Sequence, residues 1–597
     1  MKKWISIFLL HLLGGGAVFA QNSETTRGMV YEQNEQGQNI PIIGANVYWL
    51  GTSVGVSTDL DGRFEIETVA ETDMLVFSFV GFQNDTVKVR SSGPIKVILK
   101  SDVQLETVEI GARKKSTEYS YVNPLKIEQI GEEELLKAAC CNLSESFETS
   151  PSVDVSFTDA VTGARQIQML GLAGRYTQIT GEYMPEVRGL ASIFGLTFIP
   201  GTWVDGIQLN KGTGTVVNGF ESIAGQINAE FKKPWGDEAV ILNLYGNEGG
   251  RMEGNLIYNQ KLKREWYSGL LLHGNYTPFD HDRNHDGFLD HPKSNSIIAM
   301  NRWRHLNEKG LRMQLAAKYT YVEKVGGQRG YQHVGDEHNH TATDLWGLYL
   351  KTNRADVWAK IGRVYESKPW KSIGSQYRFA YHDQVMDFGN RTSLATQYSS
   401  YANLLYESIL KNTNHTFQTG VSFMGDVYKE SLDSLNLDRN EWVPGAYFEY
   451  TYKHFDKFTL VLGLRGDYHN HYGLFSTPKL HLRYAPTDNL VFRIGGGKGQ
   501  RTANVIFENM GVLASSRDIV IHGDGSDKPF GLEMEKAWNV GGSVTRTFTW
   551  GFRDGAVSMD FYRTDFKNQI VVDLDRSTRE VHFHNLVGKL YFNSFQV

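Results

Sequence analysis

The sequence predicts a fold dominated by β-strands, with a transmembrane antiparallel β-barrel over residues 236–597. Long stretches of this region alternate apolar and polar residues, which is typical of strands that face lipid on one side and a lumen on the other. The mean hydropathy of −0.36 and the lack of an apolar run of about 18 residues beyond the N-terminus exclude a bundle of transmembrane helices. Barrel strands hide their hydrophobicity by alternation, so a barrel remains compatible with both observations.

The N-terminus predicts a signal peptide over residues 1–20. Lys2 and Lys3 precede a short apolar run, and the small residues Val18 and Ala20 suit cleavage before Gln21. The apolar run is too short to span a bilayer, and no stop-transfer pattern follows that would favour the alternative of an uncleaved anchor. We therefore expect the mature chain to be exported.

Residues 21–103 predict a small β-sandwich. Short alternating runs such as Ala45–Trp49 and Met74–Phe79 are separated by turn residues. The segment Thr58–Phe64 reads as a tight turn, in which Gly62 is free to adopt a positive φ. No helical periodicity interrupts this region.

Residues 116–235 predict a compact α+β domain. Its last part, Gly206–Pro234, begins with alternating apolar residues, continues through several glycines and ends on a second alternating run. An earlier part, Lys126–Pro151, carries helical signs, because its segment Ile130–Lys137 starts with acidic residues and ends on a basic one, as a helix dipole favours.

The stretch Gly206–Pro234 resembles the end of the plug domain of TonB-dependent outer-membrane receptors. The resemblance rests on Lys211-Gly212, Asn218-Gly219 and Gly225-Gln226-Ile227-Asn228, which fall in register over about twenty residues. The residues around Thr58–Phe64 likewise resemble the carboxypeptidase-regulatory-like domain that precedes many Bacteroidetes receptors of this type. The resemblance implies a periplasmic N-terminal domain, a plug inside a barrel of 22 strands, and energy-coupled import rather than catalysis.

The linker of residues 104–115 contains a segment, Glu106-Thr107-Val108-Glu109-Ile110, that looks like a TonB box. A short extended segment with a free edge can be captured by strand addition. The resemblance implies a TonB-ExbB-ExbD-type energising complex as its partner. The alternative is that these residues are only a linker strand.

Four sulfur-containing residues of the plug predict a soft-metal site. Cys140 and Cys141 are adjacent, and Met169 and Met184 follow in the same domain. Thiolates and thioethers suit Cu(I), and free exported thiols oxidise unless they are used. The alternative is that the cysteines are small buried residues and the methionines fill the core. The segments around Cys140 and Met169 also resemble a receptor subgroup associated with heavy-metal, chiefly copper, handling.

Two insertions of the barrel are candidate cation sites. The first places Asp282, Asn284, Asp286 and Asp290 at the first, third, fifth and ninth positions of a calcium loop, but its twelfth residue is lysine rather than glutamate. We therefore expect no complete EF-hand, although a calcium ion can still order the loop. In the second insertion, His338 and His340 can share a copper or zinc ion. The alternative there is a solvated polar loop.

The length of the barrel region predicts an incomplete wall. A plugged barrel of 22 strands needs about 440 residues at roughly 20 per strand and connection, whereas residues 236–597 suffice for about 16 strands. The last residues, Leu590–Val597, read as a strand in mid-course. We expect several C-terminal strands to be missing from the sequence.

The predicted function is import of a copper ion or metal chelate across the outer membrane, with the substrate bound at the plug apex and the extracellular loops. The alternatives are a ferric-siderophore receptor and a binding or adhesion protein anchored by its barrel. The net charge of −6 offers no basic patch for nucleic acid, and no nucleophile, base and orienting group suggest an enzyme. Lipid is an expected partner, no cofactor is required, and copper or calcium are the candidate bound ions.

Overall fold

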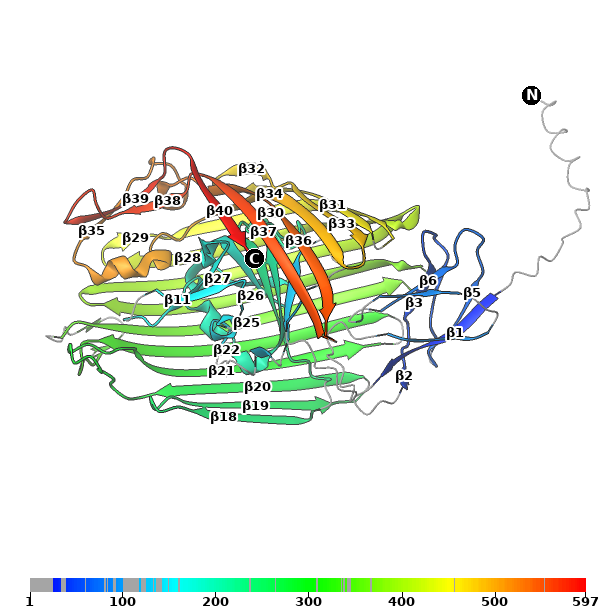
Figure 1. The fold of residues 1–597 in the computed structure, drawn as a ribbon. Helices are drawn as coiled ribbons and strands as arrows, with labels where there is room; N and C mark the ends of the chain where they lie inside the picture. Colours follow the sequence, from blue (N-terminus) through cyan, green and yellow to red (C-terminus); the bar gives the residue numbers. More distant parts are fainter. Residues whose placement is uncertain are drawn as a thin grey trace, which may run out of the picture. The chain divides into compact units, whose positions relative to one another are not determined.

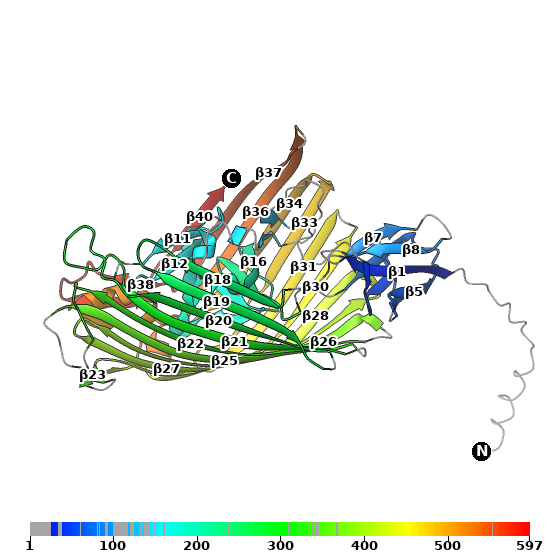
Figure 2. The same ribbon diagram turned by 90° about the horizontal axis from the view of Figure 1, so that it is seen from below.

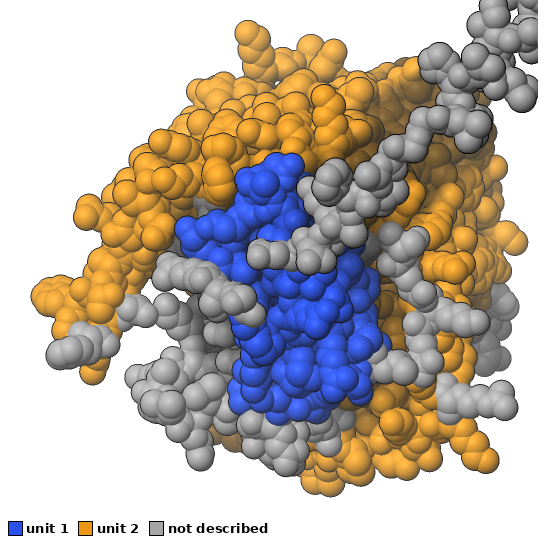
Figure 3. Space-filling model, turned by 90° about the vertical axis from the view of Figure 1, so that its right-hand side faces the viewer, with its two compact units in different colours: residues 1–100 blue, residues 101–597 orange. Residues whose placement is uncertain are grey.

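The computed structural model divides into two compact units, residues 1–100 and 101–597 (Figure 3). No helix in the described part of the chain is long and apolar enough to cross a membrane. The residues that the structure describes are 25–33, 39–59, 61–79, 82, 84–89, 93–99, 117–119, 125–131, 134–135, 142–148, 150–158, 161–235, 238–263, 265–307, 310–333, 335–336, 339–340, 345–365, 368–455, 457–551 and 553–597.

The first unit is a β-sandwich, which confirms the prediction. One sheet contains β1, β2, β5 and β8, and the other has the order β4-β3-β6-β7. Alternate residues of both sheets, among them Val47, Trp49, Phe64 and Phe77, enter one buried cluster. The strands are β1 Thr25–Gln33, β2 Asn39–Pro41, β3 Asn46–Trp49, β4 Gly55–Ser57, β5 Arg63–Glu67, β6 Met74–Ser78, β7 Asp85–Lys88 and β8 Ile95–Ile98.

The plug, defined here as residues 116–235, is built on a six-stranded sheet of order β15-β14-β17-β16-β10-β9. The stretch Gly206–Pro234 supplies most of the antiparallel pair β16 and β17, which the alternation predicted. A smaller sheet has the order β11-β12-β13. The strands are β9 Thr117–Tyr119, β10 Ile127–Gly131, β11 Asp154–Phe157, β12 Arg165–Met169, β13 Leu172–Ala173, β14 Thr177–Gly181, β15 Met184–Val187, β16 Val204–Lys211 and β17 Gly225–Phe231.

The helical expectation for Lys126–Pro151 is wrong at its start. Ile127–Gly131 forms strand β10, which pairs with β16, because alternate side chains of this segment are buried and β16 offers a free edge. Helical geometry appears at Glu134 and Leu135. Five short 3₁₀ turns also occur in the described part of the plug, namely η1 Glu145–Phe147, η2 Gly174–Tyr176, η3 Gly189–Ala191, η4 Gly195–Phe198 and η5 Gly201–Trp203.

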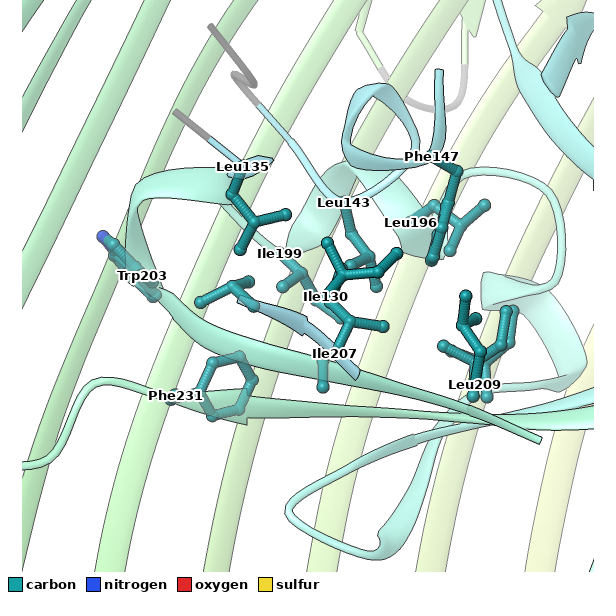
Figure 4. Packing of buried hydrophobic residues seen from close by; sticks show 14 of the residues in the cluster. Ile130, Leu135, Leu143, Phe147, Leu196, Ile199, Trp203, Ile207, Leu209 and Phe231 are labelled. Carbon is teal, nitrogen blue, oxygen red and sulfur yellow. The ribbon is translucent and has the colours of Figure 1, made fainter. Parts of the chain in front are cut away.

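The core of the plug lies on one face of its sheet. Ile130, Leu143 and Ile199 lie close together at its centre, next to Ile207 of β16 (Figure 4). Side chains of the surrounding wall, such as Trp358, belong to the same cluster. The plug therefore shares its apolar core with the wall.

The wall is one antiparallel sheet of eighteen strands, of which two, β29 Leu435–Asn436 and β32 Gly473–Ser476, are short. Its strands follow one another in chain order from β18 to β40, and no pairing joins β18 to β40 among the described residues. The long strands are β18 Val240–Gly246, β19 Met252–Lys261, β20 Trp266–Thr277, β21 Lys293–Leu306, β22 Leu311–Gly327, β25 Gly347–Tyr365, β26 Lys368–Phe388, β27 Arg391–Leu410, β28 Asn412–Leu432, β30 Arg439–His454, β31 Phe458–His469, β33 Lys479–Thr487, β34 Leu490–Arg501, β36 Glu535–Trp550, β37 Arg553–Lys567 and β40 Leu590–Gln596.

The two faces of the wall have the polarity that the alternation predicted. In β22, Ala317 and Tyr319 point outward and are exposed, whereas Lys318 and Thr320 point inward and are buried. Outward apolar residues such as Leu244 of β18 and Val540 of β36 are also exposed. An apolar outer face and a polar inner face are typical of a barrel wall in lipid.

The connections of the wall are short at one end and long at the other. At one end β27 joins β28 through residue 411, and β33 joins β34 through residues 488–489. At the opposite end, residues 502–534 join β34 to β36 and contain η6 Phe507–Ala514, β35 Asp518–Ile521 and η7 Pro529–Gly531. Residues 568–589 there contain β38 Ile570–Asp573 and β39 Glu580–Asn585. We call this opposite end the long-loop end.

The plug lies on the concave side of the curved wall. Both ribbon views place the cyan plug elements inside the arc of green, yellow and red wall strands (Figures 1 and 2). The inward polar side chains of the wall therefore face the plug.

Candidate functional site between plug and wall

A strained turn of the plug places a carboxylate among three cations. Glu182 and Tyr183 form the two-residue turn between β14 and β15, and both have positive φ, 53° and 62°. This turn type normally uses asparagine and glycine, so the backbone of a Glu-Tyr turn is strained. The Glu182 side chain is 3% exposed, and its carboxylate accepts hydrogen bonds from Lys233 Nζ (2.9 Å), Arg302 Nη2 (3.1 Å) and Lys360 Nζ (3.1 Å). These contacts hold the turn to β21 and β25 of the wall.

The cations determine the charge of Glu182. Burial alone raises the pKa of its carboxyl, but the three neighbouring cations lower this pKa well below its ordinary value. Glu182 is therefore ionised wherever the plug is seated. The compensated charge offsets the backbone strain of the turn.

Two further residues of the same hairpin bind the wall. Glu186 of β15 is paired with Arg378 and accepts a hydrogen bond from Lys318 Nζ (2.5 Å). Arg188, just after β15, is paired with Asp426 of β28 and with Glu221 of the plug (3.3 Å). The hairpin is thus joined to the wall through charged groups at residues 182, 186 and 188.

The opposite side of the plug is joined to the last strands of the wall. Lys126 and Lys211 both donate to Asp560 of β37, at 2.7 and 3.2 Å. Nearer the long-loop end, the hydroxyl of Tyr176 donates to Glu535 (2.9 Å), which is also paired with Arg501 (2.5 Å). Charged and polar contacts therefore fasten the plug on both of its sides.

A polar cavity of about 70 Å³ lies between plug and wall. Thr177, Gln178 and Arg188 line it from the plug, and Arg439 and Arg501 line it from the wall. The side-chain oxygens of Thr177 and Gln178 are buried and have no hydrogen-bond partner within the described chain. Buried polar groups normally form hydrogen bonds. The cavity is large enough for ordered water or a small polar ligand, and these two oxygens can accept hydrogen bonds from it.

Of the segment Gly181–Gly201, which the family resemblance predicted as the plug apex, residues 189–198 are covered by apolar residues of the long-loop end, and we keep the name plug apex for them. Leu190 and Phe194 of the apex belong to one buried cluster with Phe507 and Met510 of η6. Phe583 of β39 joins the same cluster. The loops must therefore part before a large substrate can reach the apex.

Several predicted site residues lie outside the described residues, namely the segment Glu106, Thr107, Val108, Glu109 and Ile110, the pair Cys140 and Cys141, the signal peptide of residues 1–20, and His338. His340 lies in β24 (Asn339–His340), which pairs with β23 (Gly335–Asp336), but its side chain is not described. For these residues the assignments stay predictions.

Both predicted methionines are buried in the plug core. The sulfur of Met169 lies against Gly225, which pairs with Thr177 of β14, whereas Met184 pairs with Gly181 at the other end of the same strand. Four residues of extended chain separate these two points, about 13 Å. The structure therefore does not bring the two thioethers together.

The loop proposed for calcium is an ordered turn. Asp282 accepts hydrogen bonds from the backbone N–H groups of Asp286 (3.1 Å) and Gly287 (3.2 Å). Asp290 accepts one from Arg283 (3.0 Å), which closes the loop, and Asn284 donates to Asp286 (2.9 Å). Within the described residues, no group of three or more His, Cys, Asp or Glu side chains is arranged to hold a metal ion.

The sequence offered no signal for the plug–wall contacts. Glu182 is 120 residues from Arg302 and 178 from Lys360. No local spacing relates residues so far apart. The alternation indicated only that Lys318 points into the lumen, and it did not indicate that Lys318 pairs with Glu186 of the plug.

The comparisons with known proteins agree with this architecture. A family model described as TonB dependent receptor-like, beta-barrel matches residues 243–593. A second, described as CarboxypepD_reg-like domain, matches residues 26–110.

Curated relatives match a shorter part. TonB-dependent receptor SusC of Bacteroides thetaiotaomicron is 37% identical over 119 residues, which is 19% of this chain and 11% of the relative. TonB-dependent receptor P26 of Formosa agariphila is 38% identical over 98 residues, 16% of this chain and 10% of the relative. The matched segments thus span only about a tenth of the length of these relatives.

Solved structures share the fold. They include FpvAI in complex with pyocin S2 (TM-score 0.60, 12% identity, 79% of this chain and 68% of that one). The siderophore receptor PirA from Acinetobacter baumannii has a TM-score of 0.59 at 14% identity, covering 79% and 77%. The copper transporter OprC has a TM-score of 0.60 at 13% identity, covering 80% and 76%. At such identities the likeness shows the fold alone.

Proposed function

Because this chain belongs to the family of TonB-dependent receptors, whose barrels lie in the outer membrane, we propose that it imports a metal species, a copper ion or a metal chelate. The long-loop end of the wall is extracellular, since outer-membrane barrels have short periplasmic turns and longer extracellular loops. Substrate binds at the plug apex after the covering loops part. The plug then shifts to open a path.

The observation that carries the proposal is the polar boundary between plug and wall. Glu182, Glu186 and Asp560 join the two parts through ion pairs rather than covalent bonds. A polar cavity lies along the same boundary. Water can replace these polar contacts as the plug moves, so its displacement costs most free energy where plug and wall share buried apolar side chains such as Trp358. A boundary of this kind suits a plug that is displaced and then reseated.

The energising partner is a TonB-ExbB-ExbD-type complex, and Glu106–Ile110 is the segment that it captures by strand addition. Deleting this segment should abolish uptake while the level of folded receptor in the outer membrane stays unchanged. The matched control replaces the five residues by an alternating sequence of the same length and charge. Uptake that survives the deletion would favour the alternative of an adhesion or binding protein.

For the substrate, copper is favoured over a ferric siderophore because Cys140 and Cys141 are soft ligands that can bind Cu(I) as a pair. Met169 and Met184 remain members of the proposal, but they lie beside opposite ends of β14, about 13 Å apart along the strand, so we expect one of them at most to join the cysteines. The test is Cu(I) titration of the refolded receptor under reducing conditions. Stoichiometric binding that is lost in Cys140→Ser/Cys141→Ser supports copper, and equal binding by both proteins supports siderophore uptake.

Two loop sites complete the proposal. Calcium orders the extracellular loop of Asp282, Asn284, Asp286 and Asp290, whose oxygens suit a hard cation. Calcium should slow tryptic cleavage after Arg283 in the wild type but not in Asp282→Ala. His338 and His340 are proposed to contact the imported metal at the extracellular surface.

A further inference from the structure

Three histidines gather on a small sheet of the extracellular loops. β35 pairs in parallel with β39, and β39 pairs with β38. His582 and His584 are two residues apart on β39 and therefore point to the same face. His522, which follows β35, lies beside them, with its ring 5.0 Å from that of His582 and 6.3 Å from that of His584.

The closest contact joins two ring nitrogens. His522 Nε2 lies 2.9 Å from His582 Nδ1. Two nitrogen ligands of one metal ion, each about 2.05 Å from it, are about 2.9 Å apart when they subtend a right angle and about 3.3 Å apart at the tetrahedral angle. The observed separation fits neighbouring positions of a tetragonal site, the geometry of copper(II) or nickel(II).

The surroundings of His582 prepare it as a metal ligand. Its other nitrogen, Nε2, lies 3.3 Å from a carboxylate oxygen of Glu580. This nitrogen has no hydrogen-bond partner in the described chain, and a proton taken up there would meet the carboxylate and leave the lone pair on Nδ1, an arrangement common behind metal-bound histidines. His582 itself is 5% exposed and so is held in place.

The other members of the cluster leave room for a metal ion. His522 is exposed, so water can complete the coordination. His584 Nδ1 is buried without a hydrogen-bond partner in the described chain. The positive charge of Arg576 disfavours metal binding, because its Nη1 donates a hydrogen bond to His522 Nε2 at 3.4 Å. This contact is exposed to solvent, so water weakens the repulsion and can replace the hydrogen bond.

We propose that His522 and His582 form an extracellular binding site for a tetragonal divalent metal ion, copper(II) above all, with Glu580 as the positioning residue of His582. The proton that His582 Nδ1 donates to His522 Nε2 moves to Nε2 of the His582 ring, beside Glu580, so both rings bind as neutral ligands. The site is separate from the plug cysteines, and it does not depend on import.

The test is copper(II) titration of the full-length receptor in detergent, in a Cys140→Ser/Cys141→Ser/His338→Ala/His340→Ala background that removes competition from the other proposed copper sites. Electron paramagnetic resonance should show one copper(II) with two nitrogen ligands. His522→Ala should lower the affinity at least about tenfold, because even outer partners of a metal site contribute 10–100-fold. Glu580→Gln should lower it less, and Arg576→Ala should raise it.

The matched control is His454→Ala, which removes an exposed histidine from the short-turn end of the wall and should leave binding unchanged. Equal affinities of the parent and His522→Ala would overturn the proposal. So would a copper signal with fewer than two nitrogen ligands in the parent protein. Because binding is read on purified receptor, neither result bears on uptake.

Discussion

At the scale of single residues, Glu182 is a plug carboxylate that forms ion pairs with three cations at once. Its buried carboxylate contacts Lys233, Arg302 and Lys360, of which Arg302 is buried as well. Removing one member of a buried ionic group leaves the others uncompensated, which costs more than the pair contributes. The turn that carries Glu182 is strained as well, so it depends on these contacts.

We therefore expect Glu182→Gln to lower the free energy of unfolding by about 3–5 kcal/mol. Equilibrium denaturation of the refolded receptor measures this change. Asp565→Asn, which removes an exposed partner of Arg563, is the control and should cost less than about 1 kcal/mol. Equal losses in both variants would contradict a special role for the buried cluster.

The lowered pKa of Glu186 leads us to expect that the stability of the protein depends on pH. Burial raises the pKa of its carboxyl, but Arg378 and Lys318 outweigh burial and lower this pKa from 4.5 to about 2. A carboxyl whose pKa is lower in the folded state stabilises the fold fully above its unfolded value and loses that effect as pH falls. Stability should thus decline between about pH 4.5 and 2.

The measurement is the unfolding free energy across this pH range for the wild type and Glu186→Gln. The variant is less stable at neutral pH, but its stability should fall less steeply in acid, because it has no carboxyl to protonate at this position. Parallel pH profiles would show that other carboxyls carry the acid sensitivity.

At the scale of elements, the glycines between β16 and β17 bring the plug close to the wall. Gly212 has a φ of +78°, and a Cβ there would lie 2.9 Å from the ring of Tyr562 and 3.1 Å from Asn539. The plug hairpin can approach β37 this closely only because the side chain is missing.

Gly212→Ala should therefore be more destabilising than Gly473→Ala. Gly473 has a similar φ of +71° but no atom within 4 Å of the added Cβ. The control should cost about 1–2 kcal/mol for the left-handed backbone alone. Gly212→Ala should cost a further 1–3 kcal/mol or so for crowding against the wall. Thermal unfolding of both variants measures the difference, and equal melting temperatures would contradict it.

Alternation predicted the elements well where one face is apolar. The polarity of β22, the sandwich of the N-terminal unit and the pair β16 and β17 all follow from a period of two. The segment Ile127–Gly131 shows the limit, since the charge order of the overlapping Ile130–Lys137 suggested a helix while pairing with β16 made Ile127–Gly131 a strand. The pattern His582-Phe583-His584 was a signal that sequence reasoning missed, and its partner His522 lies 60 residues away.

At the scale of the whole molecule, the two units have separate cores. The N-terminal unit buries Trp49, Phe64 and Phe77 in a cluster of its own. We expect a fragment of residues 21–103 to fold cooperatively when expressed alone, because domains of this size can form an independent core.

Fluorescence of Trp49, the only tryptophan between residues 21 and 103, together with circular dichroism, should follow one unfolding transition. Phe77→Ala should lower its stability by about 3–5 kcal/mol. A fragment that shows no cooperative transition would mean that this unit needs the rest of the chain to fold.

The arrangement of plug inside wall could be predicted only through the resemblance of Gly206–Pro234 to a known family. The charges that fasten the plug come from wall strands hundreds of residues further along the chain. The side chains that face the lumen are polar in any barrel, so polarity alone does not say which of them meets Glu182 and which meets water.

The order of the wall strands has a consequence for assembly. Each wall strand from β18 to β40 pairs with the next wall strand along the chain, so the wall can grow hairpin by hairpin, with a short turn to close at one end and a longer loop at the other. The ion pairs of Lys126 and Lys211, however, cannot form until Asp560 has been synthesised, 434 and 349 residues further along the chain. The plug is synthesised first, and its contacts to the last strands form last, so a receptor interrupted late in biogenesis would carry a nearly complete wall around a plug that is fastened on one side only.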